Sequence, residues 1–156
     1  MNTAANHLGL ALPSGKVAVF APHQGEILLE HESGVRDIAV DEELEIDMGA
    51  SADVLVSALQ ESGTIDAAHA AMLPLLPGVT LRSLKIDAVN RVDISNAKPM
   101  DVQFELRLQL PAGARVVRAD HPLGAKNGRP IFRLKVPANG SATLRYQTEH
   151  TADRVT

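Results

Sequence analysis

The amino-acid sequence predicts an all-β protein, in which an antiparallel immunoglobulin-like β-sandwich occupies the C-terminal half. Two observations favour this fold class. Apolar and polar residues alternate through residues 102–110, and this two-residue period is typical of a strand with one buried face. Turn residues then interrupt the alternation at intervals of about 8 to 12 residues, as they do in sandwiches. A small antiparallel β subdomain and one short connecting helix are expected to precede the sandwich.

The N-terminal subdomain is predicted to span residues 8–60 and to consist of short strands separated by Gly and Pro. Leu44, Ile46 and Met48 alternate with acidic residues, which indicates a half-buried strand whose acidic face is solvated. The expected strands are residues 16–20, 26–31, 36–40, 43–48 and 52–59.

A connector is predicted at residues 61–78, where the alternation is lost. Thr64 can cap a short helix over residues 64–72, and Pro74 would end it because proline lacks a backbone donor and clashes within a helix. The apolar residues that follow admit two interpretations, a plug over one end of a sheet or a segment that binds a partner protein. These candidate interaction residues are Met72, Leu73, Leu75 and Leu76.

The sandwich is predicted at residues 79–150, with longer strands. Asn127 and Gly128 form a strong signal for a tight hairpin turn, and Pro137 to Gly140 favours another turn. The expected strands are residues 80–95, 102–110, 115–119, 131–136 and 142–148. Their inward-facing residues should form one core, consisting of Phe104, Leu106, Leu108, Phe132, Leu134, Leu144 and Tyr146.

Composition excludes several kinds of function. The chain has no Cys, so disulfides and thiolate chemistry are absent. The formal net charge is −4 and the basic residues are dispersed, so nucleic acid is not expected as a partner. No apolar stretch reaches the roughly 20 residues that span a bilayer, and no signal peptide is recognisable at the N-terminus. The chain is expected to be periplasmic or extracellular if it is a module of a longer protein, and a cytoplasmic location stays open.

No motif of catalysis or cofactor binding is found. The six His residues include no HxxxH pair, which would place two metal ligands on one helix face. No serine lies in a GxSxG elbow, and no glycine-rich phosphate loop occurs. We therefore expect no catalytic residue, no metal and no cofactor.

Several segments resemble, in the same order, the C-terminal domain of the mucoidy-inhibitor-like proteins of bacteria, a domain of unknown function. They run over residues 8–150 and comprise LPSGKVAVF at residues 12–20, residues 41–48, the turn at residues 92–99, Leu110-Pro111, His121-Pro122, FRLKVPANG at residues 132–140 and Leu144 to Tyr146. The resemblance implies a protein of the bacterial envelope. It carries no catalytic residues to this chain.

The leading hypothesis is a non-enzymatic structural or protein-interaction module of an envelope or surface protein, binding another protein or a neighbouring domain. A sheet edge or the Met72 to Leu76 segment would make the contact. The alternative is a small-ligand or carbohydrate-binding domain with a site in the turns near His121 and Asn127. A hydrolase with carboxylates or histidines assembled across strands is the third class, and scarce aromatic residues count against a sugar platform.

Overall fold

The computed structural model describes the backbone of residues 1–76 and 79–155, and the side chains of residues 1–66 and 83–153. The described residues form nine strands and one 3₁₀ turn, and every strand pair is antiparallel. The predicted all-β antiparallel class is therefore confirmed. The chain divides into two compact units, Met1–Ser51 and Ala52–Thr156.

The first unit is built on a hairpin of β1 (Gly15–His23) and β2 (Glu26–Val35). Gln24 and Gly25 connect the strands with φ angles of 50° and 90°. Two successive positive φ angles are the requirement of a type I′ turn, whose twist matches that of the flanking strands. The predicted strands at residues 16–20 and 26–31 lie within this hairpin.

The predicted strands at residues 36–40 and 43–48 are wrong. This part of the chain forms no ladder. In the described residues its backbone pairs with other segments through the bridge between Leu12 and Ile38 and through the hydrogen bonds of Asp41 and Glu42 with Asn2. The alternation had a real cause, since Leu44 and Ile46 are half-buried while Glu45 between them is exposed, although Met48 is exposed as well. Alternating burial requires only one apolar surface, whereas a strand also requires a neighbouring backbone with which to pair.

Hydrogen bonds of Asn2 connect the segments of the first unit that lie outside the hairpin. Its side chain is fully buried and its Nδ2 donates to the carbonyl oxygens of Leu10 and Ala39, at 2.6 and 3.0 Å. The Gly9 amide donates to Asn2 Oδ1 at 2.9 Å. The Asn2 backbone pairs with that of Glu42 and Asp41 as well. One buried amide thus ties three segments together, which satisfies its own polar atoms.

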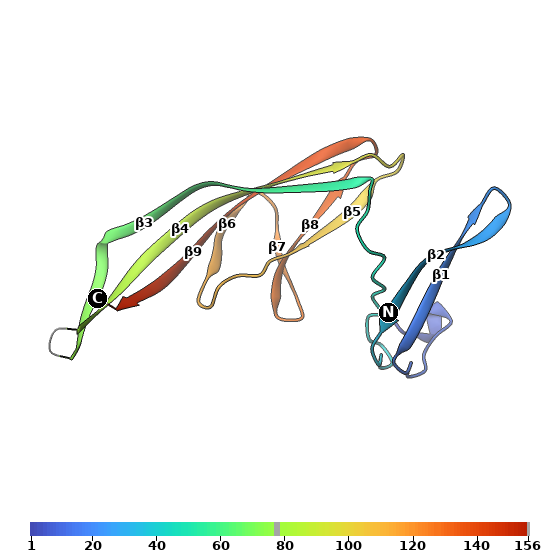
Figure 1. Ribbon diagram of the computed structural model, residues 1–156, viewed down its shortest axis with the longest axis horizontal. Coiled ribbons are helices and arrows are strands. Elements are labelled where there is room, and N and C mark those ends of the chain that lie inside the picture. The colour runs from blue at the N-terminus through green and yellow to red at the C-terminus, as the bar shows by residue number, and fades with distance from the viewer. Residues whose placement is uncertain (77–78, 156) are drawn as a thin grey trace. The chain divides into compact units, whose positions relative to one another are not determined.

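The second unit contains two antiparallel sheets (Figure 1). The larger has the strand order β3-β4-β9-β6, and the smaller has the order β5-β8-β7. Strands β3, β4 and β9 continue side by side well past the smaller sheet. Their bounds are β3 (Val54–Leu76), β4 (Val79–Asn96), β9 (Gly140–Val155), β6 (Arg115–Ala119), β5 (Val102–Arg107), β8 (Arg129–Val136) and β7 (Leu123–Lys126).

The predicted helix at residues 64–72 is wrong, and residues 61–76 belong to β3 instead of forming a connector. Thr64 and Ile65 pair with Asp87 and Ile86 of β4. A helix of nine residues is marginal by itself, so pairing with a long neighbouring strand overrides the helix propensity of the alanines. The division between the units falls at Ser51, before this segment, and not within residues 61–78.

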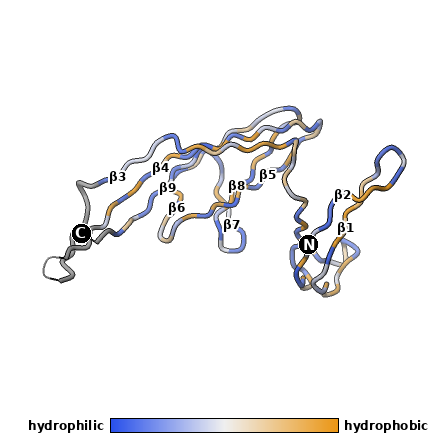
Figure 2. The backbone as a smooth tube through the Cα atoms, in the orientation of Figure 1, coloured by the Kyte–Doolittle hydropathy of each residue, from blue (hydrophilic) through white to orange (hydrophobic). Residues whose placement is uncertain are grey.

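The strands expected in the C-terminal half are present. Residues 80–95 lie in β4 and residues 115–119 form β6, while β5 ends at Arg107, before the predicted end at residue 110. Asn127 and Gly128 have φ angles of 50° and 74° in the tight turn between β7 and β8. The alternation of hydrophobic and hydrophilic residues can be followed along the strands in Figure 2.

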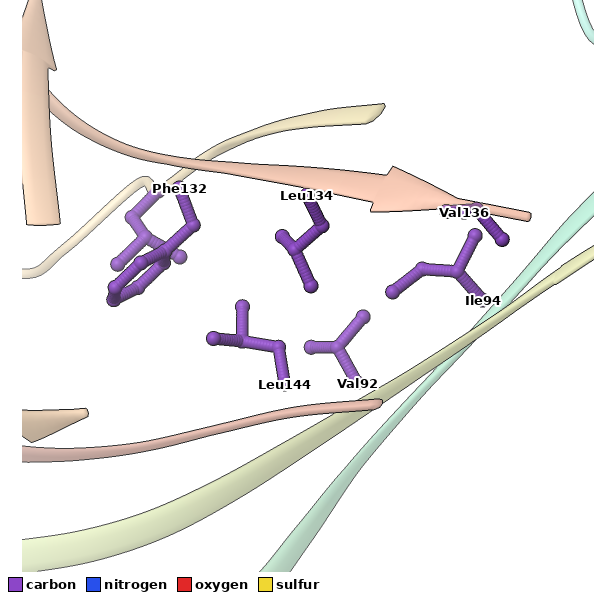
Figure 3. Close-up of a cluster of buried hydrophobic side chains, with 7 residues drawn as sticks. Val92, Ile94, Phe132, Leu134, Val136 and Leu144 are labelled. Carbon is purple, nitrogen blue, oxygen red and sulfur yellow. The ribbon is translucent and has the colours of Figure 1, made fainter. Parts of the chain in front are cut away.

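The core lies between the two sheets (Figure 3). Phe132 of β8 and Leu144 of β9 have no exposed surface. Of the predicted core, Phe104, Leu106 and Tyr146 are partly buried and pack against this centre. The sequence interpretation missed three members of it, although all lie in strands that it expected. The buried cluster is Val92, Ile94, Leu108, Phe132, Leu134, Val136 and Leu144.

The pairing of the last strand differs from that of an immunoglobulin domain. There the final strand joins the sheet of the strand that precedes it in sequence. Here β9 lies between β4 and β6, and β8 lies in the other sheet between β5 and β7. The two sheets pack around one core, but this strand order is not the immunoglobulin order.

Candidate functional site: the exposed edge of β3

The feature of the second unit that most needs explanation is the edge formed by β3. This strand is the first of its sheet and pairs with β4 on one side only. Its first seven residues, VLVSALQ at residues 54–60, contain no charge, no Pro and no Gly. We call residues 54–60 the β3 edge segment. Natural edge strands are usually shortened, charged or covered, because their unpaired backbone groups can recruit another strand.

The β3 edge segment exposes apolar side chains on both faces of the sheet. Leu55 and Leu59 are 65% and 60% exposed and stand opposite Ser95 and Arg91 of β4, on the outer face. Val56 is 49% exposed and stands opposite the core residue Ile94, so it belongs to the inner face. The smaller sheet thus leaves the inner face of the edge uncovered at Val56.

A β-bulge at Glu61 ends the β3 edge segment. Gln60 pairs with Asn90 and Ser62 with Val89, which leaves Glu61 as the extra residue. Its carboxylate lies 3.2 Å from Arg145 Nε and 3.8 Å from an Arg91 guanidinium nitrogen. The bulge therefore replaces the apolar edge with a charge that is compensated within the protein.

The outer face of β4 and β9 differs from the edge, because its charges neutralise one another. Asp93 accepts hydrogen bonds from Thr143 Oγ1 at 2.7 Å and from Arg91 Nε at 3.0 Å, and these bonds lower the pKa of Asp93. Farther along, Lys85 Nζ lies 2.9 Å from Glu149. Hydrogen bonds from Lys85 and then Arg115 lower the pKa of Glu149. Over the side chains that the structure describes, this face is a solvated ion-pair surface.

The residues proposed from the sequence as contact or ligand sites do not form one site. The side chains of Met72, Leu73, Leu75 and Leu76 lie outside the described residues, although their backbone belongs to β3. His121 lies between β6 and β7, where its Nδ1 is 2.7 Å from Asp120 Oδ1. Asn127 occupies the hairpin turn, and that turn explains its presence without a ligand.

The sequence interpretation missed the β3 edge segment as a contact surface. It placed a strand at residues 52–59 but could not tell whether that strand would lie inside the sheet or at its edge. One signal was available, since an uncharged, proline-free run of β-forming residues is a recognised hazard when exposed.

Among the described residues, no group of three or more His, Asp or Glu side chains is placed to hold a metal ion. In the same residues, no helix has the length and apolar character needed to cross a bilayer. Comparisons of the chain with protein-family models, with curated proteins and with solved structures find no match. The resemblance to the mucoidy-inhibitor-like proteins stays a prediction.

Proposed function

We propose that the chain is a non-enzymatic module that binds another protein by accepting an extended segment at the β3 edge segment. The observation that carries this proposal is the combination of an unpaired strand edge with exposed Leu55, Val56 and Leu59 beside it. Strand addition obtains affinity from main-chain hydrogen bonds and specificity from alternate side chains. The β3 edge segment supplies both.

The free energy gained by burying apolar side chains favours a bound partner strand along the β3 edge segment. Each large apolar side chain removed from water contributes about 1.5–3 kcal/mol. Leu55 and Leu59 lie on one face, four residues apart with Ser57 between them, so a single added strand could cover both. An uncharged edge left open would invite uncontrolled aggregation, which favours a dedicated partner.

The chemistry of the segment specifies the partner. No charge lies between Val54 and Gln60, and the segment exposes Leu55 and Leu59 on the outer face and an apolar valine, Val56, on the inner face. The matching partner is an extended, uncharged peptide segment of another protein with β-branched or aliphatic residues at successive positions. A charged segment would have to bury unpaired charge against these side chains, which is costly.

The experiment is selection of heptapeptides on the intact chain from a displayed random library, followed by measurement of affinity for synthetic peptides. We expect enrichment of uncharged aliphatic sequences. The variant Leu55→Lys/Leu59→Lys should weaken binding by at least about tenfold, equivalent to about 1.4 kcal/mol. Val117→Lys, at an apolar position of β6 that is 42% exposed, is the matched control and should bind as the unmodified chain does.

Backbone methylation of the selected peptide makes the test specific for strand addition. Successive N–H groups of a strand point to opposite sides, so methylating every second nitrogen should abolish binding in one frame and leave it nearly intact in the other. Three outcomes would refute the proposal. These are an equal loss of affinity for both methylation frames, equal affinity of the two lysine variants, and a library selection without enrichment. Sedimentation of the chain alone shows whether a second copy of the chain occupies the β3 edge segment. A dimer formed through this edge would also overturn the assignment to a different protein.

The broader setting belongs to the same proposal. The resemblance to the mucoidy-inhibitor-like proteins supports a place in the bacterial envelope. The absence of a recognisable catalytic motif in the sequence supports a binding role over an enzymatic one.

A further inference from the structure

A second site lies on the inner face of the larger sheet, beyond the core. Here the loop between β5 and β6 covers part of β4 and β9 and leaves a groove of about 280 Å³. The groove lies on the face of the sheet, so it is distinct from the β3 edge segment except where Gln60 reaches it. Its apolar floor and walls are Ile86, Ala88, Leu110, Pro111 and Ala114.

The polar side chains around the groove are free to bind a ligand. Five of them, Gln60, Gln109, Tyr146, Thr148 and His150, form no side-chain hydrogen bond with the described part of the chain. The sixth, Asn90, has a single long contact of 3.5 Å from Nδ2 to the Ala88 carbonyl. A half-buried Tyr hydroxyl usually finds a partner, so this collection of unused donors and acceptors points to a missing one.

Neighbouring residues shape the surroundings of two of these side chains. The Tyr146 ring packs against Phe132 with the ring centroids 5.5 Å apart, and Phe132 is fully buried. The Gln60 amide lies over Gly63, where a Cβ atom would come within 2.5 Å of Gln60 Nε2. Glycine therefore leaves room for this amide at the groove.

We propose that the groove binds a neutral saccharide of one or two rings. No Asp, Glu, Lys or Arg lines it, so a charged ligand would find no counter-charge. Amide side chains present a donor next to an acceptor, which matches the vicinal hydroxyls of a sugar. The aliphatic floor and Tyr146 match the apolar C–H face of a pyranose ring.

The backbone beneath the groove favours a saccharide over a peptide. Strand β4 is paired with β3 and β9, and β9 is paired with β4 and β6. The main-chain groups of both strands are thus used within the sheet, so an extended peptide lying on this face would lack backbone partners there. Side chains must supply the recognition, and a ligand rich in hydroxyl groups suits them best.

The only Tyr of the chain lines the groove, and the chain has no Trp, so the intrinsic fluorescence comes from this one residue. The probes are D-glucose, D-galactose, N-acetyl-D-glucosamine and their β-1,4-linked disaccharides, with glucuronic acid and a blocked neutral tripeptide for comparison. We expect at least one neutral sugar to change the Tyr146 emission saturably at concentrations up to about 20 mM, in the range of weak specific binding.

Matched glutamine variants make the assignment specific. Gln109→Ala should weaken sugar binding by about tenfold, whereas Gln103→Ala, which changes an exposed glutamine of β5 outside the groove, should leave it unchanged. Thermal unfolding of each variant shows that the fold is intact. Absence of any sugar response, equal effects of the two variants, or tighter binding of the tripeptide or of glucuronic acid would overturn the proposal.

Discussion

Phe132 and Tyr146 face each other across the two sheets of the second unit, with ring centroids 5.5 Å apart and an interplanar angle of 38°. Phe132 comes from the smaller sheet and is fully buried, while Tyr146 comes from the larger sheet and is half-buried. This tilted contact joins the core to the groove. It also makes the fluorescence of Tyr146 a probe of the folding of the second unit.

Replacement of Leu144 by Ala should destabilise the second unit strongly. Leu144 has no exposed surface and lies in the centre of the core, so the loss should be about 2–5 kcal/mol of unfolding free energy. Urea unfolding followed by Tyr146 fluorescence measures it. Val117→Ala, at a position that is 42% exposed, should cost less than about 0.5 kcal/mol. Similar losses at the two positions would show that the inner and outer faces are misassigned.

The phenol of Tyr146 should ionise at higher pH than a free tyrosine. Burial raises the pKa of Tyr146, because the phenolate is poorly solvated in its site. The neutral phenol makes its full contribution to the free energy of unfolding below the pKa of the unfolded chain, which is about 10. That contribution is lost as the pH rises through the higher pKa of the folded protein. Absorbance near the phenolate band, in native and denatured protein, tests this without ambiguity because the chain has one Tyr. Coincident titration curves would contradict it.

The second unit should lose stability in acid through Glu149. Hydrogen bonds from Lys85 and then Arg115 lower the pKa of this carboxyl in the folded protein. Its contribution to the free energy of unfolding is therefore present above the unfolded pKa of about 4.3 and is lost as the pH falls through the lowered pKa. Glu149→Gln should therefore flatten the acid limb of a stability profile. In about 1 M salt the difference between the two proteins should shrink, because exposed pairs are screened. A parallel offset at all pH values would argue against this cause.

Asn2 should be essential for the structure of the first unit outside the hairpin. Asn2→Ala leaves the Leu10 and Ala39 carbonyls and the Gly9 amide without their partner inside the protein, at an expected cost of about 1–3 kcal/mol. Amide hydrogen exchange at Gly9 should accelerate accordingly. Asn6→Ala removes an exposed bond to Met1 and is the control, with little change expected. Unaltered exchange at Gly9 in Asn2→Ala would show that its side chain is dispensable.

Local patterns predicted most strands of the second unit correctly. Asn127 and Gly128 identified a hairpin because few residues accept two positive φ angles in succession. The alternation around Phe104 and Leu106 identified a buried face for the same kind of local reason. Which strand becomes an edge is a property of the whole sheet, so the exposure of Leu55 and Leu59 could not be read from their own segment.

The errors have the same origin. The alanines after Ile65 favour a helix locally, yet pairing with the neighbouring strand β4 determines the outcome. The groove escaped prediction because Gln60, Gln109 and Tyr146 come from three distant parts of the chain. No spacing in the sequence brings an edge strand, a loop and a central strand together.

The bulge at Glu61 has an evolutionary consequence. Gln60 and Ser62 pair with the consecutive residues Asn90 and Val89, so removal of Glu61 would leave a continuous ladder with every other β3 partner unchanged. A single-residue deletion inside a strand normally turns all later side chains to the opposite face. Here it would remove one carboxylate beside Arg91 and Arg145 and preserve the facing of Ile65. The register of β3 on β4 therefore tolerates a change in length of one residue at this position, at the cost of that one ion-pair partner.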